Sequence, residues 1–371
     1  MKMRRKCTIS NKKKLIIAGM LSLSAAMAYF LAAVSSWIAE FVFARGIYRA
    51  SSLVINTVTG ILPFSVSEII VVLLPVVIMG RVIAWILLGV KGDKEKNFRK
   101  ELKDAGCTLC LIFGIVLFMY VLLCGVNYYR YSYAKINNIE VKEHSKEELY
   151  EMCKSLAVEM NETRGKLGEK YSGTDYKVSD YEMSDMVREA FAKSARDYSC
   201  FNEYTAKSKP LFVSYIFSCF NTTGIYSPFT VEALVNVHIP DYQIPATMAH
   251  EMAHINGFMR EDEANYIAYL VCVNSEDVRI KYSGLSLAFT HSMNRLYEED
   301  ADCYYDVWNM LSEEILMDRQ MSYEYWKNFE DTELSEMGDR INDTYLKVNS
   351  QEDGVKSYGR MVDLLLSTYY Q

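Results

Sequence analysis

Three long apolar runs occupy the first third of the chain and are separated by polar segments. Residues 15–43 are almost free of charge until Glu40, residues 69–90 carry only Arg81, and residues 107–129 carry no charge. Each run exceeds the ~18 apolar residues that distinguish a membrane-spanning helix from a buried helix of a soluble protein. The pattern predicts three transmembrane helices, at about 15–39, 69–90 and 107–128.

The first run also resembles a secretory signal peptide, because a basic segment precedes it and Ala25, Ala26 and Ala28 are small. Its length and the lack of a clear cleavage pattern favour a membrane anchor. Arg81 is explained by a long side chain that reaches toward the lipid headgroups.

Lysine and arginine are distributed unevenly around these runs. Residues 2–14 and 91–103 are rich in both, whereas the loop between the first two runs offers only Arg45 and Arg49. Basic residues near membrane helices mark the cytoplasmic side. We therefore expect a multi-pass protein of the cytoplasmic membrane, with the amino terminus in the cytoplasm, a membrane region at 1–129 and an extracytoplasmic domain at 130–371.

Beyond residue 130 the polar and apolar positions predict a mostly helical α+β domain with a small β-sheet. Helical spacing covers residues 146–167 and 179–198, the latter with Ser179 and Glu182 placed as a capping box. Residues 209–220 and 231–239 are rich in β-branched and aromatic residues, which favours strands. A proline-punctuated loop then leads into a helix that contains residues 246–255.

Composition narrows the function only slightly. The 371 residues carry a net charge of −7, and because the amino-terminal part is basic, the acidic excess belongs to the extracytoplasmic domain. Such a surface argues against a nucleic-acid partner. Nine cysteines show no regular spacing, and their pairing is left open.

The clearest chemical motif is HExxH, formed by His250, Glu251 and His254. Two histidines four residues apart lie on one face of a helix and can share a metal ion. Glu251, beside the first histidine, is then placed to remove a proton from a zinc-bound water. The motif predicts a Zn²⁺ site with hydrolytic chemistry.

A catalytic zinc needs a third protein ligand. On an unbroken helix Glu261 would lie roughly 10 Å along the axis from His254, so the chain must turn, and Asn256-Gly257 is a suitable helix end. Arg260 stands where some HExxH enzymes have a third histidine. We expect Glu263 as the ligand, with Glu261 and Glu298 as alternatives, and Asn265 or Asp262 as a residue that orients a histidine.

Segments 63–69, 224–284 and 345–366, which include HExxH and "EDEAN", resemble an uncharacterised bacterial membrane family known as a domain of unknown function. The resemblance implies three amino-terminal transmembrane helices and an outer zincin-like metallopeptidase domain, with the family's motifs at His250, Glu251, His254 and Glu263. It implies no substrate.

The predicted function is that of a membrane-anchored zinc metallopeptidase that hydrolyses peptide bonds of envelope proteins or peptides. Val235, Asn236 and Val237 are predicted to belong to an edge strand that pairs with extended substrate, although a plain internal strand fits equally well. Tyr266, Arg279, Tyr282 and His291 are unranked candidates for stabilising the oxyanion.

Two other classes remain open. One is a catalytically silent zincin-like protein that binds peptide or senses the state of the envelope. The other is a transport or assembly component in which the motif helix is only structural. Retention of Glu251 favours the enzyme, because a structural zinc needs no base. The predicted partners are a peptide or protein substrate and membrane lipid.

Overall fold

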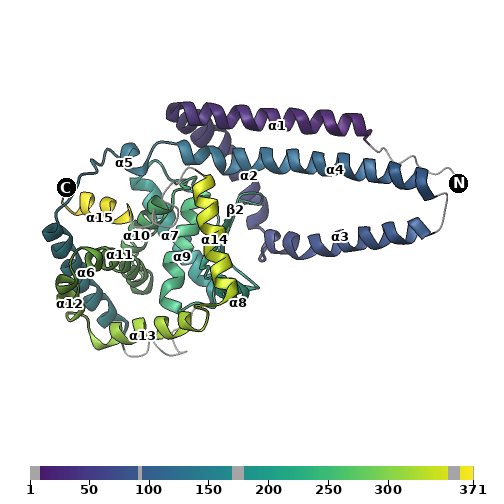
Figure 1. Ribbon diagram of the computed structural model, residues 1–371. Coiled ribbons are helices and arrows are strands. Elements are labelled where there is room, and N and C mark those ends of the chain that lie inside the picture. The colour runs from purple at the N-terminus through teal and green to yellow at the C-terminus, as the bar shows by residue number, and fades with distance from the viewer. Residues whose placement is uncertain (1–8, 91–93, 169–178, 350–359, 371) are drawn as a thin grey trace. The chain divides into compact units, whose positions relative to one another are not determined.

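The computed structural model describes residues 9–90, 94–168, 179–349 and 360–370, and it divides the chain into two compact units (Figure 1). Unit 1 comprises Met1–Tyr48 and Val66–Arg130, and unit 2 comprises Arg49–Ser65 and Tyr131–Gln371. The expected boundary near residue 130 coincides with a unit boundary. The segment Arg49–Ser65, however, belongs to the carboxyl-terminal unit.

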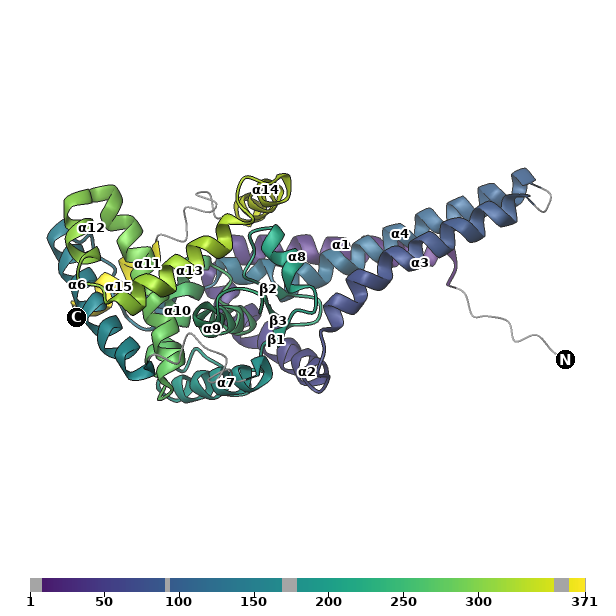
Figure 2. The same ribbon diagram turned by 90° about the horizontal axis from the view of Figure 1, so that it is seen from below.

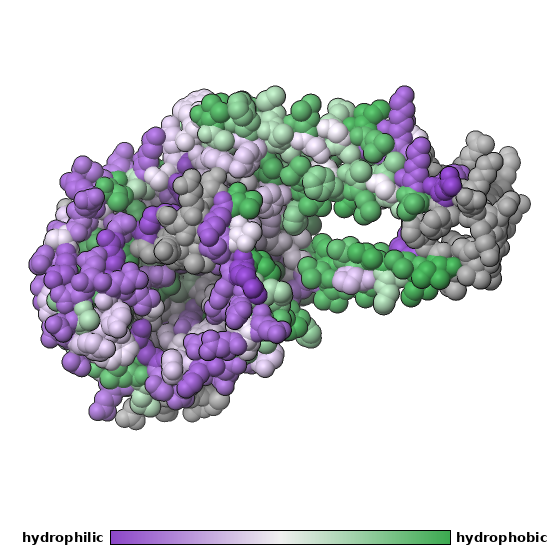
Figure 3. Space-filling model, in the orientation of Figure 1, coloured by the Kyte–Doolittle hydropathy of each residue, from purple (hydrophilic) through white to green (hydrophobic). Residues whose placement is uncertain are grey.

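Unit 1 is built from long apolar helices: α1 (Asn11–Val34), the π-helix η1 (Ile38–Tyr48), α3 (Val66–Val90), α4 (Lys94–Leu123) and the short η2 (Gly125–Tyr129). Within the part of the chain that the structure describes, three stretches are long and apolar enough to cross a membrane: Asn11–Val34, Val66–Ile83 and Arg99–Tyr129. Their surfaces are largely hydrophobic in Figure 3, with hydrophilic residues gathered toward the ends on the right. Several of the basic residues that predict orientation, in segments 2–6 and at Lys91, lie outside the described residues.

Small residues let α1 and α4 approach closely, and the two helices run side by side in Figure 1. Ala18, Ala25, Ala28 and Ala32 are buried along α1, and a methyl group added at Gly114 of α4 would stand 2.9 Å from the carbonyl oxygen of Ala18. Close packing of small residues is the usual basis of helix association in lipid. The pair forms the core of unit 1.

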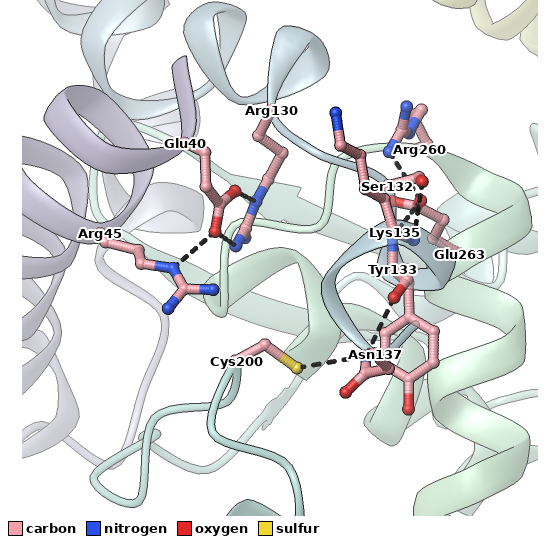
Figure 4. A network of polar contacts seen from close by, with 10 residues as sticks. All are labelled: Glu40, Arg45, Arg130, Ser132, Tyr133, Lys135, Asn137, Cys200, Arg260 and Glu263. Carbon is pink, nitrogen blue, oxygen red and sulfur yellow. Dashed lines mark hydrogen bonds and ion pairs between the residues drawn. The ribbon is translucent and has the colours of Figure 1, made fainter. Parts of the chain in front are cut away.

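Unit 1 contains a buried ion pair between Glu40 and Arg130. Glu40 is fully buried and accepts hydrogen bonds from Arg130, Nε at 2.9 Å and Nη2 at 3.1 Å, and from Nε of Arg45 at 2.6 Å (Figure 4). A buried carboxylate persists only when it is paired in this way. The charge that interrupts the first apolar run is therefore explained by a specific partner.

Unit 2 is mostly helical. Its helices are α2 (Arg49–Gly60), α5 (Tyr133–Ile136), α6 (Lys146–Leu167), α7 (Asp180–Asp197), α8 (Ser214–Cys219), η5 (Asp241–Gln243), α9 (Ile244–Ile255), α10 (Glu261–Val273), α11 (Val278–Glu299), α12 (Ala301–Trp308), α13 (Glu313–Lys327), α14 (Glu333–Val348) and α15 (Met361–Tyr369). Ser179 caps α7 as predicted, its hydroxyl accepting from the N–H of Glu182 at 3.2 Å.

A small sheet of three strands completes unit 2, in the order β1 (Lys209–Pro210), β3 (Glu232–Val235), β2 (Gly224–Ser227). β1 is parallel and β2 antiparallel to the central β3. Helix α9 packs against β2 and β3 and also against α10 and α11, and the view from below in Figure 2 shows it beside the sheet. The HExxH helix is therefore surrounded by the core of the unit.

The strand prediction for residues 209–220 is wrong over most of its length. Only Lys209 and Pro210 pair in the sheet, and Ser214–Cys219 form helix α8. The hydroxyl of Ser214 accepts the N–H of Val237 at 3.1 Å, and that of Ser218 accepts from the amide of Asn236 at 2.9 Å. These tertiary contacts override the β-propensity of the aromatic and branched residues.

Candidate metal centre

Helix α9 ends in a turn that depends on Gly257. The N–H of Gly257 donates to the carbonyl of His254 at 2.9 Å, and the N–H of Phe258 donates to Ala253 at 3.2 Å. This pair of bonds is the Schellman motif, which requires a left-handed residue, and Gly257 has φ 83°. The predicted turn at Asn256-Gly257 is confirmed, and it lets the following acidic segment return toward the histidines.

The residue brought back to the histidines is Glu261, the first residue of α10. Its Oε2 lies 3.1 Å from Nε2 of His250, and its Oε1 lies 3.7 Å from Nε2 of His254. The two Nε2 atoms are 3.1 Å apart. One potential ligand atom from each of His250, His254 and Glu261 lies within 4.8 Å of the other two. These three residues could therefore hold a metal ion.

The other nitrogen of each imidazole ring contacts an acceptor. Nδ1 of His254 lies 2.7 Å from the carbonyl oxygen of Phe258, and Nδ1 of His250 lies 2.8 Å from Oδ1 of Asn265. Each Nδ1 therefore carries a proton and each Nε2 is left with its lone pair directed at the cluster, unless it is protonated as well. Such acceptors behind histidine ligands are common in metal centres, and Asn265 lies where the sequence predicts such a residue.

Burial and the neighbouring charges determine the pKa values of the two histidines. Burial opposes the charged form of His250, but the hydrogen bond and charge of Glu261 outweigh it and raise the pKa of His250 to about 9. Burial and the charge of neighbouring His250 together lower the pKa of His254 to about 4, although the charge of Glu261 opposes this shift. A proton on Nε2 of His250 thus occupies the space between the ligands. A divalent cation would satisfy the same three groups with a larger charge, and two imidazole nitrogens with one carboxylate are a donor set that such an ion could use.

Glu251 is buried behind the first histidine. Burial raises the pKa of its carboxyl to about 8, with Glu261 raising it and His250 lowering it. Its Oε2 has no hydrogen-bond partner among the described residues, although it is buried. A methyl group at Gly224 of β2 would lie 2.5 Å from Oε1 of Glu251. The absence of a side chain at Gly224 therefore makes room for this carboxyl.

The predicted third ligand, Glu263, is not brought to the histidines. Its Oε1 accepts the backbone N–H of Tyr133 at 2.7 Å and a hydrogen bond from Nη2 of Arg260 at 2.6 Å (Figure 4). Glu298 lies exposed near the end of α11 and is absent from the cluster. The structure instead favours Glu261, the alternative that the sequence left open.

The predicted substrate strand is also corrected. Val235 lies in β3, which is bonded on both edges: its carbonyl accepts from Leu211 at 2.8 Å, and the N–H of Asn236 donates to Thr223 at 2.8 Å. Val237 follows the strand, and its N–H is taken by Ser214. A central strand has no free edge for a peptide. The edge strand beside Glu251 is β2. Its four residues do not alternate between apolar and polar, so the sequence did not predict it as a strand.

The four candidates for oxyanion stabilisation are placed differently from one another. The hydroxyl of Tyr282 donates to buried Asp318 at 2.7 Å, and Arg279 pairs with Asp277 at 2.7 Å. Tyr266 is buried and bonded to Thr368. His291 of α11 lies close enough to the cluster for His250 to lower its pKa electrostatically, an effect second to burial. Of the four, His291 is the one whose titration is linked to a residue of the cluster.

These observations define a mostly helical chain with a small sheet, three candidate membrane-spanning helices and a histidine–glutamate cluster. A family model described as "Protein of unknown function (DUF3810)" matches residues 43–366, and the chain belongs to this family. No curated protein matches the chain. No solved structure matches it either.

Proposed function

We propose that this protein is a membrane-anchored zinc-dependent peptidase that acts outside the cytoplasmic membrane. The observation that carries the proposal is the convergence of His250, His254 and Glu261, with Glu251 beside them. Two histidines and one carboxylate form a common catalytic zinc set. The fold itself is proposed to be zincin-like, on the basis of the HExxH helix packed against a small mixed sheet.

In the proposed mechanism of peptide hydrolysis, the metal ligands and Glu251 have different roles. A bound zinc ion supplies a Lewis acid that polarises the substrate carbonyl and lowers the pKa of water to about 7. Glu251 accepts the proton of the water that attacks the carbonyl carbon, and then delivers it to the amine nitrogen as the carbon–nitrogen bond breaks. Burial raises the pKa of Glu251 in the metal-free site, and the charge of a bound cation would lower that pKa again and favour the carboxylate that a base requires.

The edge strand β2 is the proposed binding strand for an extended peptide. It is bonded to β3 on one side and lies against Glu251 at Gly224. Main-chain pairing along such an edge would align a peptide bond while tolerating varied side chains. This assignment replaces the central strand that the sequence suggested.

The proposed topology is supported by the composition of unit 2. Arg49–Ser65 links the first two candidate membrane helices, and Asn56 within it donates to the carbonyl of Val231 at 2.7 Å. A chain that crosses a membrane three times would therefore keep this loop and the carboxyl-terminal unit on one side. The distribution of lysine and arginine supports the proposal that this side is extracytoplasmic.

Metal content and peptide hydrolysis test the proposal directly. The full chain is the proper material, because Arg49–Ser65 contributes to unit 2. We expect about one zinc per chain in the wild type and in Glu251→Gln, and loss of zinc in His254→Ala. A peptide library should be cleaved by the wild type alone. Stoichiometric zinc without cleavage would favour the silent binding protein, and wild type without zinc under zinc-replete conditions would refute the site.

A further inference from the structure

Helix α2 presents its polar side to the protein and its apolar side outward, the reverse of a helix on a soluble domain. Ser52, Asn56 and Thr59 recur at helical spacing and are all buried. The opposite side exposes Leu53, Val54 and Val58, the last two with 65% and 62% of their surface accessible. A solvated helix shows the opposite arrangement, so the outward face of α2 requires an apolar environment.

Hydrogen bonds fix this orientation. The amide of Asn56 donates to Val231 at 2.7 Å and accepts from the N–H of Ala206 at 2.8 Å. The hydroxyl of Thr59 lies within reach of two carbonyl acceptors, Thr230 at 3.1 Å and Ile55 of its own helix at 3.0 Å. Because buried polar groups need their partners, a rotation of α2 that buried its apolar side would leave the side-chain amide of Asn56 without both bonds.

A buried lysine anchors the carboxyl end of the same helix. Nζ of Lys209 donates to the carbonyls of Thr59 at 2.8 Å and Phe64 at 3.0 Å, and to the carboxylate of Glu232 at 2.7 Å. All three ammonium donors are thereby used. These bonds hold the segment from Thr59 to Phe64 against the rest of unit 2. The side chains of Ile61 and Phe64 nevertheless remain exposed, at 77% and 48%.

The exposed side is almost free of polar groups. Residues 50–67 contain no Asp, Glu, Lys or Arg. Thr57, a polar residue among the exposed positions, donates its hydroxyl to the carbonyl of Leu53 at 2.7 Å. Returning a hydroxyl to the helix backbone is a way to place threonine in an apolar environment.

Chain connectivity indicates what this surface contacts. Helix α2 directly follows η1, and the candidate membrane helix that starts at Val66 begins two residues after Phe64. The short connection keeps Phe64 close to the membrane boundary whatever the placement of unit 2 as a whole. Lipid is therefore the apolar medium within reach of this face, and Arg49 at the start of α2 has the charge that suits lipid phosphates.

We propose that the outward face of α2, together with Ile61 and Phe64, lies in the lipid interface of the bilayer and docks unit 2 on the membrane. This surface is separate from the proposed peptidase site, and the inference requires only that the apolar helices cross a membrane. A docked unit would keep its orientation with respect to the bilayer and so restrict the substrates that reach it.

Site-specific photo-crosslinking tests the proposal. A benzophenone amino acid is introduced at Val58 in the full chain, and in a second variant at Met317 of α13, which has a comparable exposure of 65%. Both proteins are reconstituted in vesicles of phosphatidylethanolamine and phosphatidylglycerol and irradiated. Mass spectrometry then identifies adducts of lipid, of a second copy or of the same chain.

The expected result is phospholipid adducts at position 58 in at least about tenfold excess over position 317, because an interfacial helix buries its apolar side among headgroups and acyl chains. Crosslinks from position 58 mainly to a second copy, or to another part of the same chain, would overturn the proposal. So would equal lipid adducts at both positions, or no adduct at position 58.

Discussion

Gly224 and Glu251 are in direct contact across the space between strand β2 and helix α9. A methyl group at Gly224 would lie 2.5 Å from Oε1, 2.9 Å from Cγ and 3.0 Å from Cδ of Glu251. Real Cβ atoms do not approach other atoms so closely, so the carboxyl would have to move. The position of the proposed base therefore depends on a residue that belongs to neither the HExxH motif nor its helix.

Gly224→Ala should reduce peptide hydrolysis by about a hundredfold, the typical effect of displacing a catalytic group by about 1 Å. Zinc content should stay at the wild-type level, because Gly224 approaches Glu251 and not the three proposed ligands. Steady-state kinetics and metal analysis of the purified full chain measure both effects.

Gly165→Ala is the matched control. Gly165 lies in α6, and a methyl group there would meet no atom within 4 Å. The substitution should leave activity unchanged and stabilise the helix by roughly 0.5–1 kcal/mol. Equal activity in the two variants would show that Gly224 does not position Glu251.

Glu261 and Glu263 provide a second test, because they lie in the same turn of α10 and differ in their partners. Glu261→Gln should weaken zinc binding by more than about a hundredfold, since even residues behind the ligands typically contribute 10- to 100-fold. Glu263→Gln should keep stoichiometric zinc, because its amide oxygen can still accept the N–H of Tyr133. Competition with a zinc chelator measures both affinities. The opposite ranking would restore Glu263 as the ligand.

The structure favours Glu261 over Glu263, the reverse of the order expected from the sequence, and it explains the difference. The turn at Gly257 and the return of an acidic helix follow from local rules for helix ends. The choice between the first and third residues of α10 does not, because it depends on which side of the helix faces the histidines. That side is set by Arg260 and by Tyr133, which lies 130 positions away in the chain.

Long helices were predicted best, because their periodic patterns extend over many residues: 146–167 coincide with α6. The sheet was predicted poorly. Its strands have two to four residues, and β3 is buried at every position, so no alternation marks it. The outward apolar side of α2 was also unrecognised, because residues 50–67 lie between longer apolar runs and their polar members look like an ordinary loop.

His291 predicts a specific acid sensitivity. Burial, together with the charge of His250, lowers its pKa from 6.5 to about 4 in the folded protein. Between these values the unfolded chain binds the extra proton and the folded chain does not, so the free energy of unfolding must fall as the pH falls. The contribution is fully present above pH 6.5 and is lost progressively toward pH 4, with a slope of up to about 1.4 kcal/mol per pH unit.

His291→Gln should remove this contribution and make the pH dependence of stability shallower between pH 6.5 and 4, where the lowered pKa of His254 still contributes. Thermal unfolding of both proteins in detergent with a zinc chelator measures the difference, because chelation removes any effect of metal release. A slope that is unchanged in the variant would contradict the lowered pKa. A thermal midpoint that is lower in the variant at pH 7.5 would indicate lost packing. This loss can be separated from the effect of titration, because lost packing lowers stability equally at every pH.

Asp318 is the centre of a buried network in unit 2. It accepts from Arg164, Nε at 2.7 Å and Nη2 at 3.2 Å, and from the hydroxyl of Tyr282 at 2.7 Å, and all three residues are buried. Removing one member of a buried ion pair leaves the other charge without compensation. Asp318→Asn should therefore destabilise unit 2 by about 3–5 kcal/mol, and Tyr282→Phe by about 1.5–3 kcal/mol, the usual contribution of a hydrogen bond to a charged group.

The control is Glu151→Gln, which removes the exposed pair with Lys154 at 2.7 Å and should change stability little, because solvent screens exposed ion pairs. Denaturant unfolding of the full chain in detergent gives the three values. If Tyr282→Phe abolished peptide hydrolysis while stability stayed at the wild-type level, Tyr282 would act in catalysis and its bond to Asp318 would be incidental. The burial of its hydroxyl against a carboxylate predicts the reverse: stability falls, and the folded fraction retains wild-type activity per bound zinc.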